Sequence, residues 1–522
     1  MTASSRGSIR AGLRYAMLKR SLIFVHRWLG VALCVLFLLW FPSGIGMMYF
    51  PMPSVTQALR LEHLPVLDAS KVSLSPAEAG AKLGADPDDL RLSSFDGRPA
   101  YRAGRGDGGP VLYADTGEEQ GEVSTDMVQR VAAAWTGQPV STASVEEVTE
   151  ADQWTLQTRL GELTPVFKYS WPNGEQVYVS QATGEVVQYT TTASRIGAYL
   201  GPIPHWFYFT PLRKHGPEWS RVVIWSSGIG TIAAIVGVVI GLWMYSPSRK
   251  YRYAGAPTSI PYRGQKRWHT VFGLIFGVAT VTYAFSGMLS MDPFPSFNDR
   301  VQQRRGGGDT NIFRALRGDV DPAAFGAKHP RQALEELAPL PVKELELTSF
   351  AGDAVYLATL ADGATRVVPM NGAPHSGFDH KEIVRVVSAA ADGRITTKVL
   401  NQYDRYYLDR TRRLPLPVVL AETTTEDHTR YYIDPSTARV VQTYNSSNWV
   451  NRWLYNGLHS LNFPWLYNYR PLWDIVVITL MIGGTALCVT SLVLAWRVLG
   501  RQLARVLNPK SAGEATLSED LA

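Results

Sequence analysis

Four long runs of apolar residues interrupt an otherwise polar chain. They predict helices at about Leu22–Phe50, Val222–Tyr245, His269–Met291 and Leu472–Trp496. Each run supplies the ~20 residues that a helix needs to cross a bilayer. The first run follows a basic stretch, as in a signal peptide, but it is too long and no small-residue cleavage pattern follows it. We therefore expect a retained anchor and four membrane spans.

Lysine and arginine are concentrated in three polar segments: the N-terminal tail, the loop between the second and third runs, and the C-terminal tail. Cytoplasmic segments of membrane proteins carry this excess of basic residues. We therefore predict that both termini and this loop are cytoplasmic. The long segments 51–218 and 292–470 then lie on the outer side, which for a bacterial inner-membrane protein is the periplasm.

The predicted organisation alternates helices with polar segments. In chain order it is a cytoplasmic tail (1–20), helix (21–50), periplasmic domain (51–218), helix (219–246), cytoplasmic loop (247–266), helix (267–291), periplasmic domain (292–470), helix (471–497) and cytoplasmic tail (498–522).

The net charge of +6 follows from this topology, and no nucleic-acid partner is expected. The two cysteines, Cys34 and Cys488, both fall within apolar runs. The periplasmic domains therefore have no disulfides. The sequence also has no C-x-x-C-H motif for covalent haem and no cysteine cluster for zinc or iron–sulfur.

The chain repeats itself. Ser43-Gly44 matches Ser286-Gly287 at an offset of 243 residues (286 − 43). In the outer segments, "LRLSSFDGRPAYRA" from Leu90 matches "LELTSFAGDAVYLA" from Leu345 at an offset of 255 (345 − 90). Nearly constant offsets over most of the length indicate a tandem duplication, with each half made of a span, an outer domain and a second span. Because both halves begin in the cytoplasm, the repeats are parallel.

Each outer domain alternates helical and strand patterns. Ser75–Gly84 has an N-cap serine, a proline at the first helical position and a closing glycine. Two strand-like runs joined by Asp-Gly or Ala-Gly then predict a hairpin. A second helix is expected at Thr125–Trp135 in one half and at His380–Ala391 in the other, before further strands. We therefore expect two small α+β lobes in each outer domain.

The strand motif Y-x-D-P-x-T-x-x-V-V spans Tyr432–Val441, and Ser180 replaces its aspartate in the first half. Together with four spans and the motifs "HRWLG" and "LHSLNF", it resembles the PepSY-associated transmembrane proteins. Some members of that family are inner-membrane ferric-siderophore reductases that carry haem. The resemblance implies an α+β membrane protein with four transmembrane helices and two periplasmic PepSY-like domains arranged as a tandem duplication.

Four of the ten histidines form two repeat-related pairs. His26 and His269 lie near the cytoplasmic ends of the first and third spans. His205 and His459 precede the second and fourth spans, at the outer membrane surface. A pseudo-twofold axis would bring the members of each pair face to face, as two axial ligands of a haem iron. We therefore expect two non-covalent b-type haems, with these histidines as their metal ligands.

Other metals fit the pattern less well. Zinc usually takes four ligands, and no Cys, Asp or Glu is repeated beside either pair. Copper stays open, because Met48 and Met291 are also repeat-related. Arginines near the pairs are candidates to bind haem propionates, since their planar donors match carboxylates. These candidates are Arg27 and Arg267 beside the first pair, and Arg213, Arg452 and Arg470 beside the second.

Two haems at different depths would carry electrons across the bilayer. We expect a haem-dependent transmembrane oxidoreductase that takes electrons from a cytoplasmic donor or membrane quinol. The resemblance suggests a periplasmic ferric siderophore as substrate, released as ferrous iron. Two alternatives are a non-enzymatic PepSY module that regulates a partner, and a haem or metal transporter. The transporter alternative is disfavoured, because the predicted spans lack the interrupted helices and buried acidic residues that are expected along a transport path.

Overall fold

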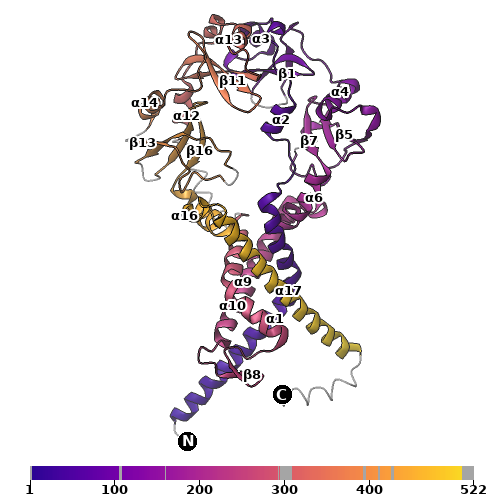
Figure 1. The fold of residues 1–522 in the computed structure, drawn as a ribbon, viewed down its shortest axis with the longest axis vertical. Helices are drawn as coiled ribbons and strands as arrows, with labels where there is room; N and C mark the ends of the chain where they lie inside the picture. The colour runs from indigo at the N-terminus through magenta and orange to yellow at the C-terminus, as the bar shows by residue number, and fades with distance from the viewer. Residues whose placement is uncertain are drawn as a thin grey trace. The chain divides into compact units, whose positions relative to one another are not determined.

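A computed structural model describes residues 3–104, 109–158, 160–291, 293, 309–391, 395–409, 412–424 and 428–507. The chain divides into two compact units, whose elements are labelled in Figure 1. The helical unit comprises Met1–Met52, Ile196–Pro293 and Val450–Ala522. The sheet unit comprises Pro53–Arg195 and Phe294–Trp449. Each unit is described by itself below.

The helical unit is built on four long helices. They are α1 (Ala3–Tyr49), α9 (Gly216–Met244), α10 (Gly264–Leu289) and α17 (Leu472–Leu507). Each contains a stretch long and apolar enough to cross a membrane, as the sequence predicted. Helix α10 packs against α9 and α17, and α1 packs against the same two helices. A short hairpin of β8 (Tyr251–Tyr253) and β9 (Ala256–Thr258) joins α9 to α10.

Glycines on α17 bring these helices close together. A Cβ atom added at Gly483 would lie less than 3.0 Å from the ring of Phe276 on α10. One added at Gly484 would meet the ring of Phe41 on α1 just as closely. Real Cβ atoms do not approach so near, so both positions require glycine. Small residues at such contacts are typical of helices that pack inside membranes.

Short helices precede α9 and α17, and they belong to the helical unit except for the first four residues of the first helix, which end at Arg195 in the sheet unit. They are α6 (Thr192–Leu200), α7 (Pro202–Trp206) and α8 (Thr210–Arg213) in the first half, and the π-helix η6 (Val450–Gly457), α15 (Leu458–Ser460) and α16 (Pro464–Tyr467) in the second. The predicted outer domains include residues 196–218 and 450–470. Instead α7 packs against α1, and α15 packs against α10. His205 and His459 therefore lie among the long helices.

The sheet unit contains a six-stranded sheet in the order β12-β11-β10-β1-β2-β3. Its strands are β1 (Leu90–Phe95), β2 (Arg98–Ala103), β3 (Val111–Tyr113), β10 (Val342–Phe350), β11 (Asp353–Leu360) and β12 (Thr365–Pro369). The two predicted hairpins are present, with positive φ angles at Asp96-Gly97 and Ala351-Gly352. This conformation is the type I′ turn that suits two-residue hairpins.

The two halves of the chain share this sheet. Strand β1 pairs antiparallel with β10, with Leu92 opposite Leu345. Both leucines are fully buried in one core with Tyr101 and Tyr356. The sequence analysis did not predict this pairing, which covers two strand edges that would otherwise be exposed.

Two further sheets have four strands each. One contains β4 (Ser144–Glu147), β5 (Val166–Ser170), β6 (Gln176–Ser180) and β7 (Val186–Thr190), and the other β13 (Ile395–Leu400), β14 (Val418–Thr423), β15 (Arg430–Asp434) and β16 (Arg439–Tyr444). The remaining helices of the sheet unit are α2 (Gln57–His63), α3 (Pro76–Leu83), α4 (Thr125–Thr136), α5 (Leu160–Leu163), α12 (Asp309–Arg317), α13 (Pro330–Glu336) and α14 (His380–Ala390). Helices α3, α4 and α14 begin and end within one residue of their predicted bounds.

Candidate functional site

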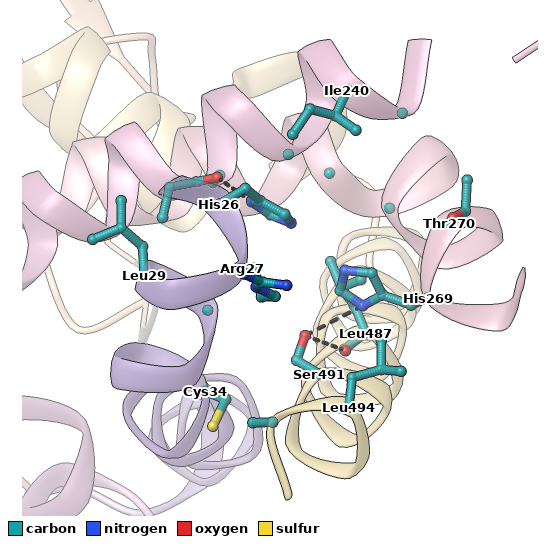
Figure 2. A pocket seen from close by; sticks show the side chains of 18 of the residues that line it. His26, Arg27, Leu29, Cys34, Ile240, His269, Thr270, Leu487, Ser491 and Leu494 are labelled. Carbon is teal, nitrogen blue, oxygen red and sulfur yellow. Dashed lines mark hydrogen bonds between the residues drawn. The ribbon is translucent and has the colours of Figure 1, made fainter. Parts of the chain in front are cut away.

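His26 and His269 lie face to face inside the helical unit, and we call them pair 1. His26 is on α1 and His269 on α10, and their ring centroids are 6.1 Å apart. The Nδ1 atom of His26 lies 3.0 Å from the backbone carbonyl oxygen of Ala233 on α9. The Nδ1 atom of His269 lies 3.3 Å from the hydroxyls of both Thr490 and Ser491 on α17. All four long helices thus position this pair (Figure 2).

His205 and His459 form the second pair, which we call pair 2. They lie on α7 and α15, and their ring centroids are 5.9 Å apart. The Nδ1 atom of His205 lies 3.2 Å from the hydroxyl of Ser43 on α1. The Nδ1 atom of His459 lies 3.1 Å from the hydroxyl of Ser286 on α10. The structure therefore brings together both predicted pairs.

The two pairs lie at different depths along the helices. Ser43, which contacts His205, follows His26 on α1 by 17 residues (43 − 26). At 1.5 Å per residue this separation is a rise of about 25 Å. The hydrocarbon core of a bilayer is ~30 Å thick. Pairs 1 and 2 are therefore spaced to lie near opposite faces of a membrane.

The hydrogen bonds of pair 2 define the protonation of its imidazoles. The hydroxyl of Ser43 donates to the carbonyl oxygen of Leu39 at 2.5 Å, and that of Ser286 donates to the carbonyl of Thr282 at 2.6 Å. Since each hydroxyl proton is already used, its oxygen can only accept from the histidine. The proton of each ring therefore sits on Nδ1.

The same reasoning applies to pair 1. A backbone carbonyl such as that of Ala233 can only accept, so His26 also carries its proton on Nδ1. Ser491 donates its hydroxyl proton to Leu487 and can accept from His269. Metal-bound histidines usually use their second nitrogen in this way. None of the four Nε2 atoms forms a hydrogen bond to the described residues, so each keeps a lone pair for a metal.

The spacing within each pair fits one metal ion between two imidazoles. An imidazole nitrogen binds a metal at about 2 Å, which places the centroids of two opposed rings roughly 6 Å apart. The observed separations are 6.1 and 5.9 Å. Among the described residues, no group of three or more His, Cys, Asp or Glu side chains could hold a bare metal ion. Two opposed histidines can be the only protein ligands of a haem iron.

A cavity of about 410 Å³ surrounds pair 1, with residues of all four long helices in its wall. Cofactor sites commonly have volumes of roughly 300–1,000 Å³. The repeat-related Gly30 and Gly273 both line this cavity. A Cβ at Gly30 would meet nothing within 4 Å, and one at Gly273 would meet only a Leu487 methyl group at 3.9 Å. The wall is therefore open at both glycines, where a flat macrocycle could lie against the helix backbone.

Basic side chains also line this cavity. Arg27, Lys266 and Arg501 are all part of its wall, and Figure 2 shows Arg27 beside His26 and His269. The sequence analysis had singled out Arg27 but neither Lys266 nor Arg501. An apolar cavity with two opposed imidazoles and basic groups for carboxylates fits a haem. Arg267, by contrast, donates to the hydroxyl of Thr258 outside the cavity wall.

The three arginines predicted for pair 2 each engage neighbouring residues. Arg213 lies over the rings of Tyr208 and Trp219. Arg452 is 2 % exposed and donates to the backbone carbonyl of Asn462 at 2.8 Å. Arg470 forms an ion pair with Asp474 at 2.5 Å. Their role toward a propionate stays a prediction.

Burial keeps pair 2 neutral. It lowers the pKa of His205 to about 3, and the charge of His459 would lower it further. Burial likewise lowers the pKa of His459 to about 4. Removing an imidazolium from water disfavours its charged form. Both rings are therefore neutral at physiological pH, which is the form that binds metals.

The residues that orient the histidines are not among the predicted site residues. Ser43 and Ser286 served only to align the two halves, yet they bind His205 and His459. The neighbouring glycines lie against the same rings, since a Cβ at Gly44 or Gly287 would be in ordinary contact with Cε1 of His205 or His459, at 3.6 or 3.4 Å. The repetition of the Ser-Gly pair was the signal that could have identified them.

The sheet unit has a larger cavity, of about 1,510 Å³, with many charged side chains in its wall. Glu344 and Glu346 project into it from β10. Glu344 accepts two hydrogen bonds from Arg60, at 2.7 and 3.0 Å, and lies 3.8 Å from Arg91. Glu346 pairs with Arg439 and, at 3.8 Å, with Arg317. Each glutamate is thus shared by two arginines.

The fold defines this chain as an α+β protein with four candidate membrane-spanning helices. The family model described as "PepSY-associated TM region" matches residues 24–378, which is more than half of the chain. The chain therefore belongs to the PepSY-associated transmembrane family, as its motifs indicated, and is a multi-pass membrane protein. No curated protein matches the sequence.

Proposed function

We propose that this protein is a di-haem inner-membrane reductase that passes electrons across the bilayer to a periplasmic ferric siderophore and releases ferrous iron. The observation that carries this proposal is the geometry of the two histidine pairs. In each pair the two imidazoles face each other about 6 Å apart, with Nδ1 hydrogen-bonded and Nε2 left for a metal.

The residues have distinct roles in this proposal. His26 and His269 would hold one b-type haem, and His205 and His459 the other. Arg27, joined by Lys266 and Arg501, would bind the propionates of the haem at pair 1. A bound haem supplies one-electron exchange between ferrous and ferric iron. The protein binds and orients the two groups, and its apolar helices keep water away from pair 1.

The orientation follows from the positive-inside rule. It places pair 1 near the cytoplasmic face and pair 2 near the periplasmic face. A cytoplasmic donor or a membrane quinol would then supply electrons at pair 1. Both termini are cytoplasmic and the sheet unit is periplasmic in this arrangement.

We also propose that the sheet unit consists of two PepSY-like domains related by tandem duplication. In support, its two four-stranded sheets have matching orders, β4-β5-β6-β7 and β13-β14-β15-β16. The contacts of Ser43 with His205 and of Ser286 with His459 are equivalent as well.

The cavity of the sheet unit is our proposed docking place for the ferric complex. Its volume exceeds the roughly 300–1,000 Å³ of common ligand sites, and its charged wall suits a ligand rich in oxygen atoms. Ferric iron is held by hard oxygen ligands, and reduction to ferrous iron weakens that hold. Iron release then needs no acid, base or nucleophile from the protein.

The test uses the purified protein after anaerobic reduction by dithionite. A ferric hydroxamate siderophore should reoxidise the haem bands, whereas the same siderophore loaded with gallium(III), which cannot be reduced, should leave them unchanged. A His26→Ala/His205→Ala double variant should bind no haem. A His380→Ala variant is the matched control, because His380 has no repeat partner, and it should behave as wild type.

Two results would contradict the proposal. The first is a normal haem content in the double variant. The second is a reduced protein that no ferric siderophore reoxidises. A colourless protein that captures a peptidase would instead favour the regulatory alternative, in which the four helices only anchor the outer domains.

A further inference from the structure

Three aromatic side chains form a line of ring contacts that leads from the cavity around pair 1 to pair 2, and we call them the aromatic bridge: Phe37, Phe41 and Tyr283. Phe37 lines the cavity around pair 1. Its ring centroid lies 6.5 Å from that of Phe41, which lies 6.3 Å from that of Tyr283. The ring of Tyr283 then lies 6.0 Å from that of His459 in pair 2.

Glycines on the neighbouring helices make room for this line. A Cβ at Gly230 of α9 would lie 2.9 Å from Cζ of Phe37. A Cβ at Gly484 of α17 would lie less than 3.0 Å from the ring of Phe41. Any side chain at either position would displace a ring of the bridge. Two helices therefore fix the rings where they stand.

The internal repeat explains only the Tyr283 end of the bridge, because the counterpart of Tyr283 at the offset of 243 is the aromatic Trp40 (283 − 243 = 40). At the offset of 243 residues, the counterparts of Phe37 and Phe41 are Thr280 and Ala284. The second half of the chain thus has small residues where the first half has rings. Packing equivalent helices therefore does not by itself demand rings at Phe37 and Phe41, because α10 has small residues at the equivalent positions.

Within the described residues, one further ring contact branches off the bridge. The ring of Phe37 also contacts that of Trp40, with centroids 5.7 Å apart. The backbone carbonyl of Trp40 lies 3.2 Å from Nδ1 of His205. This branch reaches His205 through a carbonyl group, whereas the main line reaches the ring of His459 through side-chain rings. The two routes part at Phe37, and Phe41 belongs only to the main line. A change at Phe41 therefore interrupts the main line and leaves the branch in place.

We infer that the aromatic bridge is the route by which electrons pass between the pair 1 site and the pair 2 site. This inference rests on the proposed di-haem function. With haem held by both histidine pairs, each transfer would oxidise one ferrous iron at pair 1 to ferric and reduce one ferric iron at pair 2 to ferrous. A quinol or a cytoplasmic reductant replaces the electron at pair 1. The rings are neither oxidised nor reduced; they fill the gap with atoms in close contact, which couples the two sites better than loosely packed side chains.

The experiment follows the two sites separately in time. Protein in sealed phospholipid vesicles, with the sheet unit facing outward, is fully reduced with dithionite and freed of excess reductant. Ferricyanide, a one-electron oxidant that does not cross the membrane, is then added outside in a stopped-flow spectrometer. A first absorbance phase should report oxidation at pair 2, and a second phase should report the electron that follows from pair 1.

Phe41→Leu should slow the second phase several-fold and leave the first unchanged. Phe276→Leu is the matched control, because Phe276 packs as closely on Gly483 as Phe41 does on Gly484, yet lies outside the bridge. The control should keep the wild-type second phase. Both variants should retain two haems and wild-type midpoint potentials. Phe41→Met, which keeps most of the side-chain volume without a ring, should slow the second phase as well.

Equal second phases in Phe41→Leu and Phe276→Leu, with both haems present, would overturn the inference and leave the proposed function standing. If Phe41→Leu loses haem, then a wild-type second phase in Phe41→Met decides against the bridge. The proposed function itself fails if wild-type protein binds no haem or shows no first phase.

Discussion

Gly237 on α9 is the position where a single methyl group should dismantle pair 1. A Cβ added there would lie 2.5 Å from Cε1 and 3.1 Å from Nδ1 of His26. Ordinary contacts begin at 3.4 Å. In Gly237→Ala the new methyl group would therefore be 0.9 Å too close to the His26 ring (3.4 − 2.5), and the ring must move by about that distance. The imidazole of His26 would move away from α9 by about this amount.

A shift of that size has two consequences. The 3.0 Å hydrogen bond from His26 to the carbonyl of Ala233 is stretched beyond its useful range, at a cost of about 0.5–1.5 kcal/mol. Loss of such an orienting partner lowers metal affinity by about 10–100-fold. Helix propensity acts in the other direction, since alanine is favoured over glycine by about 1 kcal/mol. If Gly237→Ala binds haem more weakly although α9 is no less stable, the clash between the new methyl group and His26 is the cause of the weaker binding.

The assay counts haem per chain in purified protein by the pyridine haemochrome method. We expect about one haem in Gly237→Ala, because pair 2 is untouched. Gly241→Ala is the control, since Gly241 lines the same cavity one turn further along α9, and a Cβ there would meet only the Leu274 side chain, at 3.4 Å. That variant should keep both haems. A Gly237→Ala protein with two haems and a wild-type spectrum would refute this reasoning.

Three further changes have defined outcomes. Ser286→Ala removes the partner of Nδ1 in His459 and should weaken haem binding at pair 2 by about 10–100-fold in a titration of cofactor-depleted protein; unchanged affinity would count against the role of the serine. Glu344→Gln leaves Arg60 without its buried carboxylate and should lower the free energy of unfolding of the sheet unit in denaturant by up to about 3 kcal/mol. An unshifted midpoint would show that the Arg60–Glu344 ion pair does not stabilise the fold. Ser75→Ala removes the N-cap of α3, because the Ser75 hydroxyl accepts a hydrogen bond from the backbone N–H of Glu78 at 3.3 Å. This change should cost about 1 kcal/mol in the same unfolding measurement, and Ser70→Ala is an exposed control expected to cost less.

The sequence predicted the four long helices and the membership of the histidine pairs, because both depend on signals that the sequence carries directly. Apolar length identifies a span without any knowledge of its neighbours. The constant offset that relates His26 to His269 and His205 to His459 pairs residues that are distant in the chain. The helix at Pro76–Leu83 was similarly predictable, since the capping box of Ser75 and Glu78 is local.

Other features depend on contacts between elements that no local pattern reports. The carbonyl of Ala233 that orients His26 is 207 residues away in the chain, and every helical residue has a carbonyl. Arg501 reaches the cavity of pair 1 because α17 continues beyond its apolar stretch to Leu507. The shared sheet likewise depends on which edge of β1 meets β10, and alternating patterns do not specify a partner strand.

The most direct test of the account is the reduced-minus-oxidised absorbance spectrum of the purified wild-type protein, with haem counted per chain. We predict two low-spin b-type haems, of which one disappears in His269→Ala and the other in His459→Ala. A protein that is colourless as purified, and that takes up no haem when haem is supplied, would contradict the claim that these imidazoles hold two iron porphyrins.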